Sequence, residues 1–250
     1  MAGELHERVA IVTGGGRGIG RAIALGYARA GADVLISVAR SPEEAAEVVA
    51  LGDALPGTIQ AVQADVTVAG DVDQLVQRAL EVRGRIDVLV NNAARGMRFV
   101  NERFMTDPQP FWEADPAAWN MVIATNIIGV FLMSRAVVLH MFAAGRGSII
   151  NVTINEATMT RRGFSPYGPS KAALEAMTRV WQAELDGTGV AINLLAPGGP
   201  TATGMVPDDV PEGMELLDPE IIVPAALHLA LTQTSGERIL ATEWSDSSGG

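Results

Sequence analysis

The 250-residue sequence contains no cysteine, and its three histidines, His6, His140 and His228, are far apart. The lack of cysteine excludes disulfides, thiolate zinc sites and a cysteine nucleophile. The scattered histidines form no local metal-binding motif, so we expect no metal ion in the protein. A chain without cysteine also suits a reducing compartment, and we expect a cytoplasmic protein.

Basic residues are scarce as well, because 18 Lys and Arg oppose 29 Asp and Glu and give a formal charge of −11. Binding to nucleic-acid phosphates or to an anionic membrane surface requires a basic patch. We therefore expect neither nucleic acid nor a membrane as a partner. The first residues lack the basic and apolar regions of a signal peptide. No apolar run approaches the roughly 18 uninterrupted residues typical of a membrane span.

Short apolar runs alternate with stretches of helical periodicity along the whole chain. This pattern predicts strands at 9–13, 34–38, 58–64, 86–90, 148–153 and 190–195, with an edge strand at 238–242. It predicts helices at 19–30, 42–55, 71–82, 119–141, 166–185 and 221–231. Continuous apolar strands separated by helices indicate a parallel sheet with helices on both faces. Because no repeat or linker interrupts the pattern, we expect residues 1–250 to form a single α/β domain with a doubly wound, Rossmann-type sheet.

A glycine-rich turn directly follows the first strand and reads Thr-Gly-Gly-Gly-Arg-Gly-Ile-Gly over residues 13–20. Such a turn between a strand and a helix lets backbone amides approach a diphosphate at the helix N-terminus. A P-loop is excluded because no Lys-Ser or Lys-Thr pair follows the glycines. The candidate cofactor-binding residues of this turn are Gly14, Arg17, Gly18, Ile19 and Gly20.

Tyr167 and Lys171 are four residues apart at the start of the predicted helix 166–185. We expect Ser165 to be the N-cap and Pro166 the first helical residue. The spacing places the two side chains on one helix face. A neighbouring ammonium and the positive helix end both favour the phenolate, so we expect Tyr167 to exchange a proton near neutral pH.

These motifs together resemble the short-chain dehydrogenase/reductase family, and the resemblance covers essentially the whole chain. The segment 167–171 matches the family motif Tyr-x-x-x-Lys, and Asn-Asn-Ala-Ala at 91–94 is similar to its Asn-Asn-Ala-Gly. The resemblance implies an NAD(P)-dependent oxidoreductase in which Tyr167 is the general acid or base and Lys171 also holds the nicotinamide ribose. It further implies a proton relay supported by Asn126. Other cofactor positions implied by the family are Asp65 and Val66 for the adenine, and Asn91, Ala93, Pro197 and Gly198.

One position departs from the family pattern. The family usually has a serine thirteen residues before the tyrosine, where it donates a hydrogen bond to the substrate oxygen, but here this position is Ile154. Asn155, Thr153 or Thr158 could supply the donor, or it is missing. We favour Asn155 as the fourth catalytic candidate, because an amide N–H can polarise a carbonyl.

The end of the second strand, Ser-Val-Ala-Arg-Ser at 37–41, lacks the carboxylate that would bind a ribose 2′-hydroxyl. Arg40, helped by Arg17, can instead hold a 2′-phosphate. The sequence therefore favours NADP(H) over NAD(H) as the cofactor.

Two irregular segments, 95–116 and 197–219, are expected to wall a substrate pocket at the carboxyl ends of the strands, the second as a flexible lid. Arg161 and Arg162 either attract an anionic substrate group or are solvated surface charges.

We expect an enzyme that reduces a small-molecule ketone, or oxidises the matching secondary alcohol, with NADP(H). We expect a homotetramer or dimer formed through helices 119–141 and 166–185. The alternatives are an NAD-dependent alcohol dehydrogenase working oxidatively and a non-catalytic dinucleotide-binding regulator.

Overall fold

The computed structural model describes residues 3–245, and the seven strands within them form one parallel sheet in the order β3-β2-β1-β4-β5-β6-β7. The strands are β1 (Val9–Thr13), β2 (Asp33–Val38), β3 (Thr58–Gln63), β4 (Val88–Asn91), β5 (Gly147–Val152), β6 (Val190–Ala196) and β7 (Arg238–Leu240). The strand order reverses between β1 and β4, which is the switch point of a doubly wound sheet. All seven predicted strands are present, and the predicted Rossmann-type fold class is confirmed.

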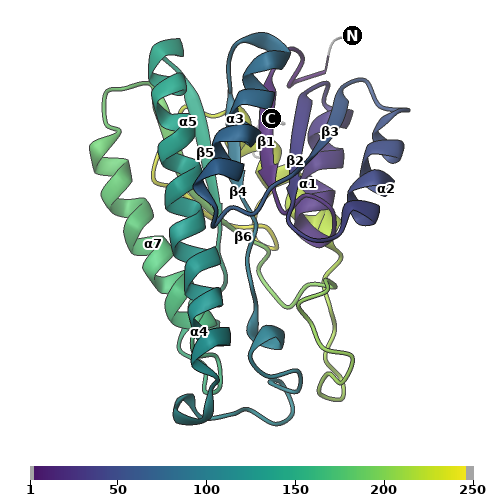
Figure 1. The fold of residues 1–250 in the computed structure, drawn as a ribbon, viewed down its shortest axis with the longest axis vertical. Helices are drawn as coiled ribbons and strands as arrows, with labels where there is room; N and C mark the ends of the chain where they lie inside the picture. Colours follow the sequence, from purple (N-terminus) through teal and green to yellow (C-terminus); the bar gives the residue numbers. More distant parts are fainter. Residues whose placement is uncertain (1–2, 246–250) are drawn as a thin grey trace.

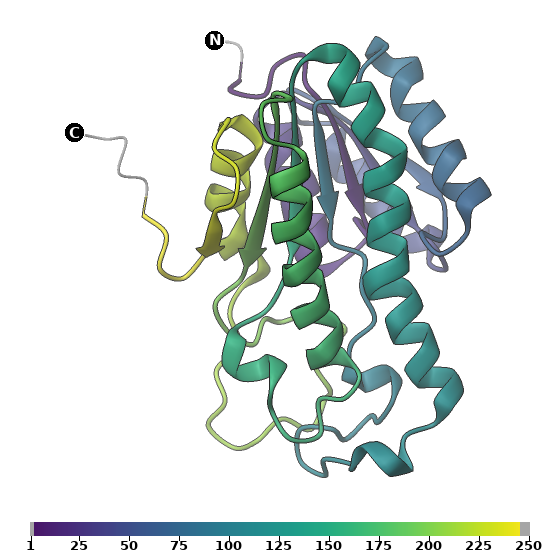
Figure 2. The ribbon, with the colours of Figure 1, turned by 90° about the vertical axis from the view of Figure 1, so that its left-hand side faces the viewer.

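Helices cover both faces of this sheet (Figures 1 and 2). One face carries α1 (Gly18–Arg29), α2 (Pro42–Gly52) and α8 (Val223–Leu231), and their apolar side chains form one core with the sheet. The other face carries α3 (Ala69–Arg83), α5 (Val130–Ala144) and α7 (Tyr167–Glu184) around a second core. Because both faces are buried, the central strands are mostly apolar, and the polar side chains within β5 and β6, Ser148, Asn151 and Asn193, are buried and hydrogen-bonded.

The predicted helix 119–141 is longer than expected, because α4 (Pro116–Ile123), the π-helical segment η3 (Ala124–Gly129) and α5 run on without a break. The Asp115 carboxylate accepts the N–H groups of Ala117 and Ala118, both at 3.2 Å, and so caps the helix before Trp119. By length and composition alone this helix could cross a membrane. We assign it to the core of the fold, because one side of α5 is buried against α3 and the sheet.

The second long helix begins one residue later than predicted. Tyr167 is the first helical residue of α7 and Pro166 is the cap, so the assignment of Ser165 as N-cap and Pro166 as first helical residue is wrong. The Ser165 hydroxyl instead accepts a hydrogen bond from Trp119 Nε1 at 3.4 Å. Tyr167 therefore lies at the very start of α7. Other element ends differ from the prediction by a few residues at most.

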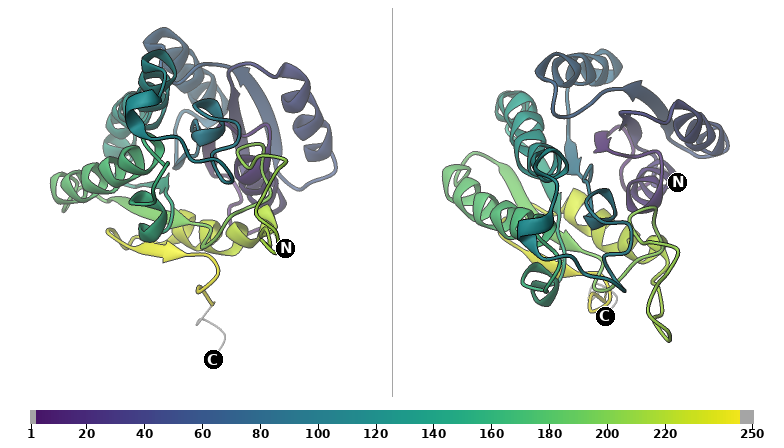
Figure 3. Two further views of the ribbon diagram at one scale, coloured as in Figure 1. Left: turned by 90° about the horizontal axis from the view of Figure 1, so that it is seen from below. Right: turned by 60° about the horizontal axis from the view of Figure 1, so that its bottom comes forward.

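The irregular segments gather beyond the carboxyl ends of the strands, at the lower end of the molecule in Figure 1 (Figure 3). They comprise residues 95–115 with the 3-10 turns η1 (Met97–Phe99) and η2 (Phe111–Glu113), the β5–α7 connection with α6 (Glu156–Met159), and residues 197–218 before η4 (Pro219–Ile222). Arg98 donates to the carbonyl of Val206 at 3.2 Å, and the Thr106 hydroxyl donates to Asp209 at 2.8 Å. The first and third segments are thus joined, and together they enclose one side of the carboxyl edge.

Candidate functional site

Two adjoining cavities open at the carboxyl edge of the sheet. The larger, called the groove here, has a volume of about 390 Å³ and extends from the glycine turn past the ends of β2 and β3. The smaller, called the inner cavity, has a volume of about 190 Å³ and lies between the end of β5, the start of α7 and the irregular segments. Ile19, Asn92 and Met205 are among the residues that line both. A single extended ligand can therefore reach from one cavity into the other.

The glycine turn forms the floor of the groove. Gly14 and Gly18 adopt positive φ angles of 65° and 53°, which L side chains rarely adopt. A Cβ atom at Gly20 would collide with the carbonyl of Gly14 and the Asn92 amide. Helix α1 begins here without a side-chain cap and without an acidic residue in its first turn. Its free backbone N–H groups and positive dipole end suit the diphosphate of a dinucleotide.

The far end of the groove carries Asp65, Arg40 and Arg95. Burial alone would raise the pKa of Asp65, but hydrogen bonds from the Thr67 N–H and hydroxyl, together with attraction by Arg95 and Arg40, hold this pKa below its usual value. Burial, and then repulsion by Arg40, lowers the pKa of Arg95. The two guanidinium groups thus act on the same small region. Within residues 3–245 neither guanidinium lies within ion-pair distance of a carboxylate, and the two arginines outnumber Asp65, so this end of the groove keeps a net positive charge.

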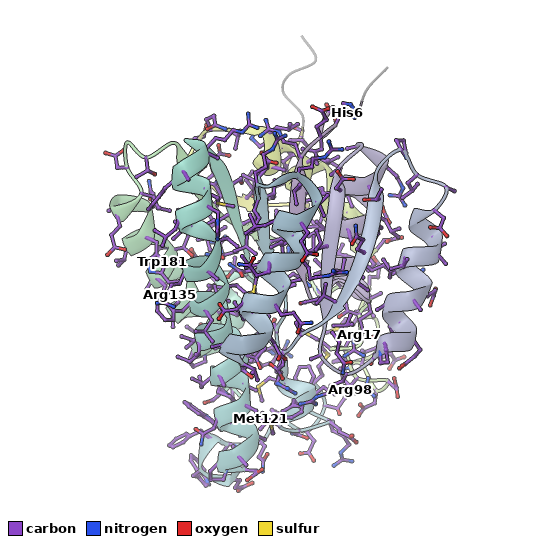
Figure 4. The ribbon with its side chains drawn as sticks, turned by 45° about the horizontal axis from the view of Figure 1, so that its top comes forward. His6, Arg17, Arg98, Met121, Arg135 and Trp181 are labelled. Atoms are coloured by element: carbon purple, nitrogen blue, oxygen red, sulfur yellow. The ribbon has the colours of Figure 1, made fainter. Side chains whose placement is uncertain are left out.

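Arg17 differs from these two arginines, because it pairs with Glu44 at 3.3 Å. Both Arg17 and Arg98 lie in the lower half of the molecule, and His6 lies at its upper end (Figure 4). Of the predicted cofactor residues, those that line the groove are Gly14, Arg17, Gly18, Ile19, Arg40, Asp65, Val66 and Ala93.

The other six predicted cofactor positions lie outside the groove: Tyr167 and Lys171 line the inner cavity, Gly20 lines neither cavity, and the remaining three are described next. The Asn91 side chain is buried and donates to Ser134 at 3.0 Å and Asn151 at 2.8 Å, so it lines neither cavity. Pro197 lines the inner cavity. The Gly198 carbonyl accepts a hydrogen bond from the Asn155 amide at 2.8 Å.

Sequence reasoning missed Asn92 and Arg95. The Asn92 amide donates to the carbonyls of Thr13 at 2.8 Å and Gly14 at 3.2 Å, and thereby joins the β4 turn to the glycine turn. Arg95 extends from the same β4 turn, donates to the Thr125 hydroxyl at 3.0 Å and lies 4.7 Å from the Phe99 ring centroid. A charged residue directly after the Asn-Asn-Ala-Ala segment is the signal that could have identified Arg95.

Tyr167 and Lys171 line the inner cavity together, as the predicted i, i+4 spacing requires. The Lys171 Nζ atom donates to the Val152 carbonyl at 2.7 Å and lies 5.9 Å from the centroid of the Tyr167 ring. Burial raises the pKa of Tyr167 to about 12 and lowers the pKa of Lys171 to about 8. The expectation that this pair and the helix end favour the phenolate is therefore wrong for the protein by itself, because desolvation outweighs both effects.

Asn126 lies in the π-helical segment η3, is completely buried and lines neither cavity. Its side-chain oxygen accepts the Arg95 N–H at 2.8 Å, and its amide donates to the Arg95 carbonyl at 3.1 Å and the Ser170 hydroxyl at 2.9 Å. Ser170 in turn donates to the Tyr167 carbonyl at 2.7 Å. Asn126 thus joins the β4 turn, which lines the groove, to the first turn of α7, which carries Tyr167.

The candidates that replace the missing serine have different surroundings. Ile154, Asn155 and Thr158 line the inner cavity. The Thr153 hydroxyl donates to the buried carboxylate of Glu175 at 2.9 Å, so its proton is already engaged. The Asn155 amide uses one N–H for the Gly198 carbonyl, and its second N–H has no partner among residues 3–245.

A buried ion pair holds the backbone next to these residues. Arg238 of β7 contacts both carboxylate oxygens of Glu175 at 3.1 and 3.2 Å and donates to the Ile154 carbonyl at 2.8 Å. The end of β5 is thereby fixed to α7 and β7. Within residues 3–245, no group of three or more histidine, cysteine or acidic side chains could hold a metal ion.

The low pKa of Lys171 predicts a measurable pH dependence of stability. The pKa of Lys171 is about 8 in the folded state and 10.5 in the unfolded state. Between these two pH values the unfolded chain binds more protons at Lys171 than the folded protein does, so the free energy of unfolding rises with pH. Relative to Lys171→Met, the wild-type free energy of unfolding should increase by on the order of 2 kcal/mol between about pH 7 and pH 9.5. Denaturant titrations at several pH values measure this difference.

Arg135→Met is the matched control for that measurement, because it removes one cation from an exposed position on α5. Its difference from wild type should stay constant with pH. Parallel pH curves for wild type and Lys171→Met would mean that the folded protein keeps Lys171 at its ordinary pKa.

Comparisons with known proteins agree with this geometry. Residues 8–212 match the family model described as short chain dehydrogenase. The chain is 39% identical over 194 residues to a 3-oxoacyl-[acyl-carrier-protein] reductase from Synechocystis, covering 78% of this chain and 74% of the relative. A dehydrogenase/reductase structure from Sinorhizobium meliloti aligns with a TM-score of 0.82 and 30% identity over 94% of both chains. A metagenomic short-chain oxidoreductase in complex with NADP aligns with a TM-score of 0.79 and 28% identity over 94% of this chain and 96% of that one. The family model spans most of the chain, and the chain therefore belongs to the short-chain dehydrogenase/reductase family of oxidoreductases that act on CH–OH and C=O groups.

Proposed function

We propose that this oxidoreductase reduces a ketone to a secondary alcohol with NADPH and that Tyr167 donates the proton. The observation that carries the proposal is the pairing of the inner cavity, which contains Tyr167 and Lys171, with a groove whose far end is cationic. The dinucleotide would lie along the groove and supply the hydride. The residues of the chain would bind and orient it, exclude water and provide the proton.

The preference for NADP(H) is supported by the charges at the far end of the groove. Arg40 and Arg95 share only the longer-range attraction of Asp65 and form no close ion pair in the described structure, whereas Arg17 is paired with Glu44. A 2′-phosphate would supply the missing negative charge, and a planar guanidinium can bind it through two N–H groups. The metagenomic relative was crystallised in complex with NADP, which supports the same preference.

The protonation states support the reductive direction. With a pKa of about 12, the Tyr167 hydroxyl carries its proton at neutral pH and is ready to donate it to a carbonyl oxygen. Lys171, with a pKa of about 8, is a stronger acid than Tyr167, so transfer of a proton from its ammonium back to the Tyr167 phenolate is favourable. We propose that Asn126 supports this relay by fixing the first turn of α7, and that Lys171 also contacts the nicotinamide ribose.

We propose that Asn155 replaces the family serine. Its amide is held by the Gly198 carbonyl and keeps one N–H for the substrate oxygen, as oxyanion-binding donors do. The other two candidates are less suited, because Thr153 is engaged by Glu175 and Thr158 lies one turn further along α6.

We further propose that the protein acts in the cytoplasm as a homo-oligomer, a tetramer or a dimer. Helices α5 and α7 run side by side on one face (Figures 1 and 2). They expose large apolar side chains, of which Leu139 on α5 is 68% and Val180 on α7 is 57% exposed. Pairing with a second copy of the chain would remove this apolar surface from water.

Substitution of Tyr167 tests the proposed reaction. Tyr167→Phe should lower the rate of ketone reduction by about 10²–10⁴-fold, because the proton donor is lost. NADPH binding should persist, because the groove is unchanged. Turnover is followed by NADPH absorbance with small and bulky ketones, and binding by NADPH fluorescence.

Tyr27→Phe is the control, because Tyr27 is the other tyrosine of the chain and is buried under α8, where it donates to the Ala226 carbonyl at 2.8 Å. This variant should keep its turnover. Full activity in Tyr167→Phe would refute the proposed proton donor. Tight NADPH binding by wild type without turnover of any ketone or secondary alcohol would favour the non-catalytic regulator.

Substitution of Asn155 tests the proposed carbonyl donor. Asn155→Ala should reduce kcat by about 10²–10³-fold, the usual cost of one lost oxyanion donor. Adding Ile154→Ser to Asn155→Ala should restore part of that loss. Thr158→Ala, which changes a neighbouring cavity residue, should leave kcat nearly unchanged. A larger effect of Thr158→Ala than of Asn155→Ala would transfer the role to Thr158.

The cofactor preference is tested by binding. Arg40→Ala and Arg95→Met should each weaken NADPH binding by about tenfold to hundredfold and leave NADH binding nearly unchanged, because only NADPH has the 2′-phosphate. Fluorescence titrations with both cofactors, for wild type and Arg135→Met as controls, provide the comparison. Equal losses for NADPH and NADH in both variants would leave the NAD-dependent dehydrogenase as the better description.

A further inference from the structure

The inner cavity combines an apolar wall with an unusual distribution of charge. Its apolar lining includes four thioether and two aromatic side chains: Met97, Phe104, Met105, Phe164, Met205 and Met214. Although the chain has 29 acidic and 18 basic residues, no Asp or Glu lines this cavity in the described structure. The two charged lining residues are Lys171 and Arg161, and both are cations. Such a cavity selects an apolar ligand with negative or no charge.

Lys171 is already committed within the site, since it donates to the Val152 carbonyl at 2.7 Å and lies beside Tyr167. Arg161 is different. It follows α6 in the β5–α7 connection, and within residues 3–245 it forms no ion pair and no side-chain hydrogen bond. Most arginines in the described part of this acidic protein have a carboxylate partner. A guanidinium that lacks such a partner and lines a cavity is a candidate anion-binding group.

Aromatic packing holds Arg161 in place. Its guanidinium carbon lies 5.0 Å from the centroid of the Phe164 ring, a cation–π distance. Phe164 is itself buried and packs edge-on against Phe104 at 5.4 Å. Stacking on a ring uses the face of the guanidinium and leaves its N–H groups free at the edge. A carboxylate can therefore accept two parallel hydrogen bonds there.

We propose that Arg161 binds a carboxylate of the substrate, and that the substrate is an oxo acid whose ketone and carboxylate are joined by an apolar body. The ketone would lie at Tyr167 and the apolar body along the methionine and phenylalanine wall. This proposal rests on the proposed reductase function. The reaction is unchanged by it: a hydride adds to the ketone carbon, the Tyr167 proton goes to the oxygen, NADPH becomes NADP⁺, and the carboxylate takes no part.

Arg162 provides a matched control within the chain. It is the next residue, it has the same side chain and both arginines are exposed, but of the two only Arg161 lines the inner cavity. If the cationic stretch acted only through its general charge, the two arginines would be interchangeable. If Arg161 binds the carboxylate directly, they are not.

The test compares phenyl-substituted oxo acids, with two to four carbons between ketone and carboxylate, with their methyl esters. Wild type should have a higher kcat/KM for at least one acid than for its ester, by about tenfold to hundredfold. Arg161→Met should abolish this preference through KM while keeping the kcat for the ester. Arg161→Lys should restore part of it, and Arg162→Met should preserve it.

The proposal would be overturned if Arg162→Met lost the preference for the acid as well as Arg161→Met. It would also be overturned if wild type reduced the esters but showed no preference for the acids. The proposed reductase function would survive in either case. If no ketone is reduced, calorimetric binding of the same acids to the protein with NADPH decides. Binding that requires Arg161 but not Arg162 supports the carboxylate site without the reductase activity, and no binding overturns it.

Discussion

Burial of both faces of a parallel sheet is the constraint on which the rest of this structure depends. Helices cover both faces, so a ligand can reach the sheet only at the ends of its strands, and the parallel strands bring all their carboxyl ends to one edge. The glycine turn after β1, the Asn-Asn-Ala-Ala turn after β4 and Asn155 beyond β5 meet there, although they are far apart in the sequence. A few buried polar contacts then fix this edge: Asn126 joins the β4 turn to α7, and the Glu175–Arg238 pair holds the end of β5.

The positive charges of the site gather at the carboxyl edge of the sheet, although the protein as a whole is acidic. The chain is acidic overall, yet the far end of the groove holds Arg40 and Arg95 beside the single carboxylate of Asp65, and the charged residues that line the inner cavity in the described structure are Lys171 and Arg161. Lys171 is also the single lysine of the sequence. The one side-chain amine of the chain therefore lies in the inner cavity, where burial lowers its pKa. Cations concentrated at one edge of an anionic protein favour a phosphorylated cofactor and an anionic substrate there.

Much of this arrangement could be predicted from the sequence, because it depends on local signals. The apolar runs of β1 and β6, the helical spacing of Tyr167 and Lys171 and the glycine turn each report their own conformation. Features that depend on tertiary contacts could not be predicted. The buried position of Asn91, the engagement of Thr153 by Glu175 and the direction of the Tyr167 pKa shift are set by residues distant in sequence. The start of α7 was misplaced because Ser165 interacts with Trp119, in α4, instead of capping the helix.

The most direct test of the account is a crystal structure of the protein with NADPH. The account predicts that the diphosphate lies at the N-terminus of α1, the 2′-phosphate contacts Arg40 and Arg95, and the nicotinamide reaches the inner cavity beside Tyr167 and Lys171. A dinucleotide bound with its nicotinamide outside that cavity, or with its 2′-phosphate away from both arginines, would contradict the assignment of the groove and of the proton donor.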